Sequence, residues 1–195
     1  MKRYPSSLHG FLFLAVMAWM PGCGDSSTAA STASEGNHPV NTAKLAINEV
    51  KTTTEDWIEI LNVDDVDAYL GGMLLADQDT NGTPKVAEAV TFVDAEKLAP
   101  GAYLLVVANL KTASPGPQTT CLMSGGPARC YQASWGISGA KGEQVFLLAP
   151  DEKVLDTVLY PANAVMDGQS YCRVPNGSGS FKACTPTPAA ANAGL

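Results

Sequence analysis

Histidine is nearly absent from this 195-residue chain, and the two copies present, His9 and His38, both lie before residue 43. Most nucleophilic catalysis by serine or cysteine uses an imidazole beside the nucleophile, and most zinc hydrolase sites use histidine ligands. The sequence after residue 42 therefore excludes these types of site. Paired carboxylates can act as acid and base without histidine, but we interpret the closely spaced Asp64, Asp65 and Asp67 as a solvated turn. We predict that the protein is not an enzyme.

Basic residues are also few, and they are never clustered. The chain has 12 Lys and Arg against 19 Asp and Glu, and its formal charge is −7 at pH 7. Nucleic-acid binding depends on groups of Lys and Arg that replace phosphate counterions, so we predict no nucleic-acid partner. An anionic lipid surface is disfavoured for the same electrostatic reason, and membrane contact would have to come through attached acyl chains.

The chain lacks an apolar run long enough to cross a membrane as a helix. Phe11–Met20 has ten residues, about half of the roughly 20 that a spanning helix needs. Lys2 and Arg3 precede it, and residues 1–22 have the layout of a secretory signal. A small residue followed by Cys23 resembles the lipobox of bacterial lipoproteins, which implies lipidation of Cys23 and anchoring in the cell envelope. The alternative is ordinary signal cleavage, which would give a soluble secreted protein with a spare thiol.

Residues 23–42 contain almost nothing that a folded domain could bury. Ser, Thr, Ala and Gly dominate from Gly24 to Ser34, and a few polar residues follow. This composition predicts a flexible tether. The remaining segment, residues 43–193, falls in the usual size range of one domain. We therefore expect a signal peptide, a tether and one folded domain that the tether holds clear of the lipid headgroups.

Four cysteines remain when Cys23 is set aside, and an even number in an exported protein indicates disulfides. Three pairings are open to them. We favour nearest neighbours, Cys121 with Cys130 and Cys172 with Cys184, because both intervals contain the Gly and Pro that tight loops need. Zinc is the competing interpretation, but the chain has no Cys-x-x-Cys spacing and no histidine near these cysteines.

The apolar pattern after residue 42 is short and strand-like, without a convincing amphipathic helix. Apolar and other residues alternate with period two in Leu45–Val50 and Trp57–Asn62. Turn signals such as Asn81-Gly82 and Pro100-Gly101 separate the later runs. These runs are Tyr69–Ala76, Val90–Val93, Tyr103–Ala108, Gln144–Ala149 and Val154–Tyr160. Many short strands at this spacing predict an all-β sandwich or barrel.

The order of these motifs resembles the lamin tail domain family. In the first half the resemblance is carried by Ile47–Val50, Asp56–Asn62, Leu70-Gly71-Gly72 with Asp77, and Leu98–Val106. In the second half it is carried by Gly136–Gly139, Gly142-Glu143, Val145, Leu147, Val154–Tyr160, Gly168–Ser170, Arg173, Phe181 and Thr185–Asn192. The match covers about Lys44–Asn192. It implies an immunoglobulin-like β-sandwich, found in bacterial exported proteins alone or beside hydrolase domains.

Two features depart from the family pattern. Met73 stands where the family usually has Trp, and Leu110–Ser134 is an extended loop that carries Cys121 and Cys130. Long loops on rigid sandwiches often carry binding functions. We therefore expect a structural or binding module in the cell envelope, with an envelope protein or a glycan as its partner.

The segment Asp77–Glu88 matches the EF-hand calcium loop at every fixed position. Its candidate calcium ligands are Asp77, Asp79, Asn81, Thr83 and Glu88. The context is not that of an EF-hand, because a strand-like run precedes the segment and Pro84 lacks the N–H usually found there. We favour an Asp-rich hairpin loop without a cofactor. A calcium-dependent adhesion or stabilising module is the alternative function.

Overall fold

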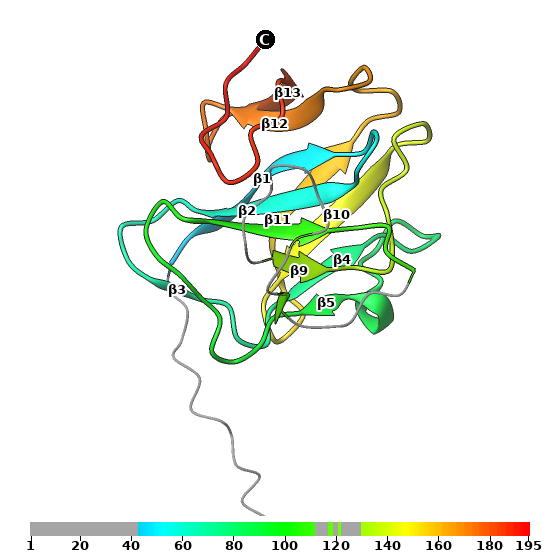
Figure 1. Cartoon of the computed structure of the whole chain (residues 1–195). Helices are drawn as coiled ribbons and strands as arrows, with labels where there is room; N and C mark the ends of the chain where they lie inside the picture. Colours follow the sequence, from blue (N-terminus) through cyan, green and yellow to red (C-terminus); the bar gives the residue numbers. More distant parts are fainter. Residues whose placement is uncertain (1–42, 112–116, 119–120, 122–129) are drawn as a thin grey trace, which may run out of the picture. The chain divides into compact units, whose positions relative to one another are not determined.

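Almost all regular structure in the described part of the chain is β-strand (Figure 1). The computed structural model describes residues 43–111, 117–118, 121 and 130–195, and these belong to one compact unit, Asn37–Leu195. The predicted signal peptide, the tether and Cys23 lie outside the described residues. The strands are β1 (Leu45–Lys51), β2 (Trp57–Asn62), β3 (Ala68–Tyr69), β4 (Leu74–Asp77), β5 (Val90–Thr91), β6 (Lys97–Leu98), β7 (Tyr103–Val107), β8 (Pro117–Gln118), β9 (Cys130–Gln132), β10 (Glu143–Leu148), β11 (Val154–Tyr160), β12 (Ser170–Val174) and β13 (Ser180–Cys184). One short 3-10 helix, η1, spans Val86–Glu88.

The strands form two main sheets. A seven-stranded sheet has the order β13-β12-β1-β2-β7-β9-β8, and a four-stranded sheet has the order β11-β10-β4-β5. Strands β3 and β6 form a separate two-stranded sheet. Among the described strands, the pairing of β7 with β9 is parallel and the other pairings are antiparallel. The expectation of an all-β fold is confirmed.

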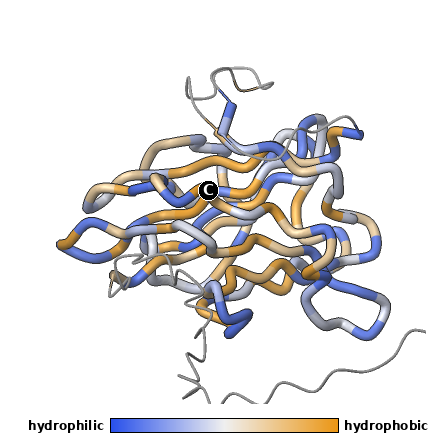
Figure 2. The backbone as a smooth tube through the Cα atoms, turned by 90° about the horizontal axis from the view of Figure 1, so that it is seen from below, coloured by the Kyte–Doolittle hydropathy of each residue, from blue (hydrophilic) through white to orange (hydrophobic). Residues whose placement is uncertain are grey.

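The main core lies between the two large sheets and contains apolar side chains from both. Ile58 and Ile60 on β2 belong to the same buried cluster as Val145 and Leu147 on β10. Figure 2 shows apolar residues concentrated along the strands and hydrophilic residues in many of the connections. Full burial of such a side chain contributes about 1.5–3 kcal/mol, so this shared cluster accounts for the sandwich-like packing of the sheets.

A β-bulge in β1 changes the alternation that the sequence predicts. The pairing of β1 with β2 shifts register between Ile47 and Glu49, and both Ile47 and Val50 belong to the core although they are three residues apart. A bulge inserts an extra residue into one strand. As a result Asn48 and Glu49, which follow each other in sequence, both make polar contacts away from the apolar core.

The run predicted as one strand at Tyr69–Ala76 is divided by a turn. Strand β3 ends at Tyr69 and β4 begins at Leu74, with Gly72 at φ +74° between them. A Cβ on Gly71 would lie 2.8 Å from the Cα of Asp94, so only glycine fits there. The Gly-Gly pair therefore allows the chain to turn closely against a neighbouring loop, and buried Met73 follows it.

Two disulfides lie toward opposite edges of the seven-stranded sheet. At one end the disulfide between Cys121 and Cys130, with a Cα separation of 5.6 Å, packs with the buried Trp57 and its apolar neighbours. Most of the predicted long loop, residues 112–116, 119–120 and 122–129, lies outside the described residues. A second disulfide joins Cys172 to Cys184 across β12 and β13, with a Cα separation of 6.0 Å. Both pairings are the ones favoured from the sequence.

Candidate functional site

Three buried polar residues form the centre of the most unusual cluster in the described part of the chain. Asn48, Glu49 and Glu59 are fully buried. Glu59 lies between two core residues of β2, so its side chain points to the outer face of the sheet. Glu49 is directly opposite Glu59 in the pairing of β1 with β2. Two like charges in this position destabilise a sheet, and burial adds a desolvation cost, so this carboxyl pair needs compensating contacts.

Glu49 receives its hydrogen bonds from β12 and from the chain near the C-terminus. The hydroxyl of Ser170 donates to Glu49 Oε1. Thr187 donates twice, from its backbone N–H to Oε1 at 3.1 Å and from its hydroxyl to Oε2 at 2.9 Å. Burial raises the pKa of Glu49, and the hydrogen bonds from Ser170 and Thr187 oppose that rise. Both oxygens of this carboxyl group are therefore engaged within the fold.

Glu59 is held in the same way. Asn48 Nδ2 donates to Glu59 Oε1 at 2.9 Å, and the backbone N–H of Ala189 donates to Oε2 at 2.7 Å. Burial raises the pKa of Glu59 from 4.5 to about 8, opposed by these hydrogen bonds and assisted by the neighbouring charge of Glu49. A group with this pKa exchanges its proton near neutral pH, so the protonation state of the cluster changes within the range in which proteins work.

Three amide side chains connect the carboxyl pair to the loop after β12 and to the C-terminal segment, which we define as residues 185–195. The side chain of Asn48 donates to Asn176 at 3.1 Å and accepts from the N–H of Gly177 at 2.8 Å. Asn192 donates from its backbone to Asn176 Oδ1 at 2.9 Å and from its side chain to the carbonyls of Asn48 and Arg173, both at 3.0 Å. The carboxyl pair, the loop and the C-terminal segment thus form one network.

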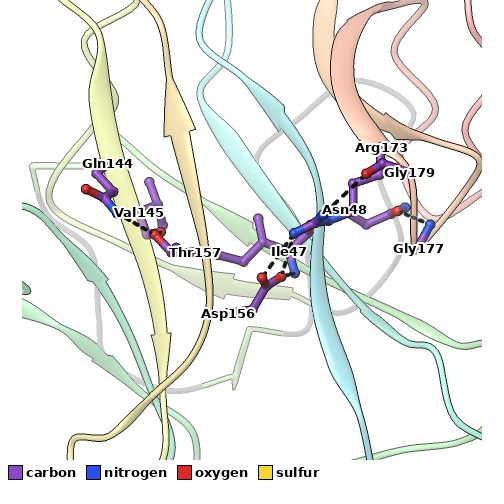
Figure 3. Close-up of polar contacts among 9 residues, drawn as sticks. All are labelled: Ile47, Asn48, Gln144, Val145, Asp156, Thr157, Arg173, Gly177 and Gly179. Carbon is purple, nitrogen blue, oxygen red and sulfur yellow. Dashed lines mark hydrogen bonds and ion pairs between the residues drawn. The ribbon is translucent and has the colours of Figure 1, made fainter.

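An ion pair fixes the neighbouring edge of the sandwich. Arg173 on β12 approaches both oxygens of Asp156 on β11, at 3.0 and 3.1 Å, and Asp156 also accepts from the N–H of Ile47 at 2.7 Å. Figure 3 shows this chain of contacts running from β11 through β1 to β12. The guanidinium also lies 4.5 Å from the ring centre of Phe181. The contacts join a strand of each main sheet.

The segment predicted as a calcium loop has a different geometry. Asp79 accepts hydrogen bonds from the N–H groups of Asn81 and Thr83, at 2.8 and 2.9 Å, which is an Asp-capped turn. Glu88 pairs with Lys85 at 2.8 Å. Within the described residues, Asp77, Asp79 and Glu88 do not form a group that could hold a metal ion. The segment follows β4 and contains only η1, so it is a hairpin loop and not a helix-flanked EF-hand.

Asp77 instead faces a carboxyl group on another strand. It shares a side-chain hydrogen bond with Glu143 on β10, and burial together with Glu143 raises the pKa of Asp77 to about 7. Glu143 also accepts from the N–H of Ser138 at 2.6 Å. A shallow hollow of about 400 Å³ lies beside this pair and is lined by Gln78, Asp79, Thr80, Lys85 and Glu143. This carboxyl pair is more accessible than the fully buried pair of Glu49 and Glu59.

The acidic turn at residues 64–67 behaves as the sequence predicts. Asp64 accepts from the N–H groups of Lys44 and Asp65, at 3.0 and 2.9 Å, and these bonds lower the pKa of Asp64. Asp67 pairs with Lys97 at 2.8 Å, and both side chains are partly exposed. Each of these two carboxylates therefore ties its loop to a neighbouring segment. The described residues also include no helix with the length and apolarity to span a membrane.

Comparison with known proteins does not assign a family or a function. No protein-family model and no curated protein matches the chain.

The sequence contains a local signal for the carboxyl pair but none for its partners. Glu49 and Glu59 each stand inside a strongly apolar strand, at Ile47–Val50 and Trp57–Leu61. A carboxyl group in a buried strand is rare unless it has partners. Those partners, Thr187 and Ala189, lie 138 and 130 residues away, and no local pattern connects them.

Proposed function

We propose that the protein is a non-enzymatic lipoprotein of the bacterial cell envelope, anchored by a lipid on Cys23. Its β-sandwich is of the immunoglobulin-like, lamin-tail type and serves as a structural or binding module for an envelope protein or a glycan. The order of strand and turn motifs in the sequence supports the lamin-tail type. The basic start, short apolar run and Cys23 support the anchor.

One observation carries the non-enzymatic part of the proposal. The carboxyl pair of Glu49 and Glu59, in which burial raises the pKa of Glu59 to about 8, is fully buried beneath the C-terminal segment. Catalytic groups need perturbed pKa values, but they must also reach a substrate. Every carboxyl oxygen of this pair accepts a hydrogen bond from the protein's own chain. The raised pKa of Glu59 is therefore a result of its burial in the fold and not of a role toward a substrate.

The two disulfides support a module that works outside the cytoplasm. One packs over Trp57 at one end of the seven-stranded sheet, and the other joins the two strands at its edge. Disulfides persist in oxidising compartments such as the periplasm and the cell surface. A cross-linked sandwich on a tether presents its loops in a fixed arrangement, which suits binding or structural support.

The anchor is tested by fractionation of bacteria that express the full chain or its Cys23→Ala variant. We expect the wild-type protein to remain with membranes after a high-salt wash and to be released by detergent, because acyl chains and not charge hold it there. The Cys23→Ala variant should appear in the soluble fraction. Equal membrane retention of the variant would remove the lipid anchor from the proposal.

The non-enzymatic part is tested at the accessible pair. If the purified protein carried out a reaction that disappeared in Asp77→Asn or Glu143→Gln, while the unfolding midpoint stayed unchanged, the module would be an enzyme with a carboxyl pair at its site. We expect no such activity in any of the three proteins.

A further inference from the structure

The C-terminal segment covers two carboxyl groups that lie opposite one another without a neutralising cation. Among the described ion pairs, none involves Glu49 or Glu59. Their polar contacts are hydroxyl, amide and backbone N–H groups. A buried carboxylate that lacks an opposite charge favours its protonated form. The cluster is therefore more tolerant of one negative charge than of two.

The same segment both excludes water from the carboxyl pair and supplies its hydrogen-bond donors. Thr187 donates from its backbone and its hydroxyl to Glu49, and Ala189 donates from its backbone to Glu59. Asn192 ties the end of the segment to Asn176 and to the carbonyl of Asn48. Departure of the segment would remove all three donors and hydrate both carboxyl groups at once. The position of the segment and the protonation of the pair are thus coupled by contact.

Little apolar packing holds the segment in place. None of residues 185–195 is buried, and none contributes to the apolar core clusters. Beyond the side-chain contacts, a single β-bridge joins Gly194 to Cys184. Segments with few buried apolar contacts open locally at a free energy below that of global unfolding. This segment can therefore leave while the sandwich remains folded.

We propose that the C-terminal segment is a proton-linked latch: it closes over Glu49 and Glu59 with uptake of a proton, and it opens when both carboxyl groups are ionised. The open form presents two carboxylates on the outer face of the seven-stranded sheet, and the closed form hides them. The proton comes from solvent and returns to solvent. The device is a property of the folded domain and does not depend on the lipid anchor.

None of the other charged or titratable groups around the network makes a described contact with either carboxyl group of the pair. The Arg173 guanidinium on β12 contacts Asp156 and the carbonyls of Ile47 and Gly179. The Tyr103 hydroxyl on β7 accepts from Asn176 at 3.1 Å. Lys182 on β13 is exposed, and its ammonium lies beside Gly194. Among these groups, the carboxyl pair is therefore the one whose protonation depends most directly on the position of the C-terminal segment.

The sign of the pH dependence follows from the environment of Glu59. Burial raises its pKa from 4.5 to about 8 in the closed form, and hydration returns the pKa toward the ordinary value in the open form. The closed form thus binds the proton more tightly, so closing is favoured at low pH. Between these two pKa values, linkage increases the ratio of open to closed forms by up to about tenfold for each pH unit.

Amide hydrogen exchange of the mature protein with both disulfides formed tests the latch. Protection factors, which correct for the intrinsic pH dependence of exchange, are measured by NMR between about pH 5 and pH 8. We expect protection of the Thr187, Ala189 and Asn192 amides to fall together, by up to about tenfold for each pH unit. The amide of Gly177, bonded to Asn48 and not to the segment, should keep its protection. Protection at the three segment amides that does not change with pH would overturn the proposal.

Two variants separate proton linkage from ordinary fraying. Glu59→Gln should abolish most of the pH dependence at the segment amides. Glu96→Gln is the matched control, because Glu96 is also buried but contacts Tyr131 and not the segment, and it should keep the wild-type dependence. An equal pH dependence in Glu59→Gln would refute the latch. If Glu59→Gln does not fold, the wild type decides: the loss of protection should level off at the pH where the carboxyl carbon shift of Glu59 titrates. A plateau at a different pH would also refute the latch.

Discussion

Replacement of Asp156 by Asn tests the contact that joins the two main sheets at their edge. Asp156 accepts from both Arg173 and the N–H of Ile47, and the two charged side chains are only 18% and 20% exposed. The Asn side chain keeps the size and one acceptor oxygen, but it loses the charge and turns an NH₂ group toward a donor. The remaining oxygen can accept from both partners, as Asp156 Oδ2 does, but the charge and the second contact with Arg173 are lost.

The expected loss lies between two known effects. Removal of one partner from a fully buried ion pair costs about 3–5 kcal/mol, and a hydrogen bond to a charged group contributes about 1.5–3 kcal/mol. The pair retains some contact with solvent, and Arg173 keeps its contacts with Ile47, Gly179 and Phe181. We therefore expect Asp156→Asn to lower the free energy of unfolding by about 2–3 kcal/mol, or roughly 4–12 °C in the unfolding midpoint.

Urea unfolding at neutral pH, with both disulfides formed, measures this loss. The matched control is Asp67→Asn, which makes the same chemical change in the ion pair with Lys97, where the side chains are 39% and 49% exposed. Exposed pairs contribute about 0–1 kcal/mol, so the control should be nearly neutral. Equal stability of the two variants would refute the reasoning that the Asp156 contact supports the sandwich.

Three further expectations follow from burial, protonation and loop geometry. Because the folded-state pKa of Glu59 is raised to about 8, the folded state binds this proton more tightly than the unfolded state does. The free energy of unfolding should therefore fall as pH rises from about 4.5 to 8, by at most about 5 kcal/mol. Urea titrations across this range measure the fall, and a flat profile would contradict it. Leu147→Ala, at a fully buried core position, should cost about 2–5 kcal/mol, whereas Leu159→Ala, at a side chain 65% exposed, should stay within about 0.5 kcal/mol. Calcium and chelator should give the same thermal unfolding midpoint, because the carboxylates of Asp77, Asp79 and Glu88 do not form a group that could hold a metal ion. A higher midpoint with calcium would indicate a bound ion, since calcium at 100 times its Kd would raise the free energy of unfolding by about 2.7 kcal/mol.

The sequence predicted the features that depend on neighbouring residues. Alternation in Trp57–Asn62 and the apolar run before Ala149 correspond to β2 and β10, because one face of each strand is buried in the shared core. The favoured disulfide pairings also followed from the composition of the two short intervals. The two-residue strands β3, β6 and β8 were not predicted, since they are too short to show a period.

Features that depend on distant contacts were not predictable in the same way. The bulge at Asn48 appears only when β1 is paired with β2. The hydrogen bond from Thr187 to Glu49 joins residues 138 positions apart. The C-terminal segment also has no apolar pattern from which this contact could be predicted. The calcium motif depends on local spacing alone, which does not show that Asp79 accepts hydrogen bonds from its own turn or that Asp77 faces Glu143.

The N-terminus of the protein extracted from bacterial membranes tests the proposed function most directly. Mass spectrometry of its first proteolytic peptide should show that the mature chain begins at Cys23 and that this cysteine carries acyl chains, as anchoring by lipid requires. A mature chain that begins at another residue, or one with an unmodified Cys23, would contradict the account of a lipid-anchored module.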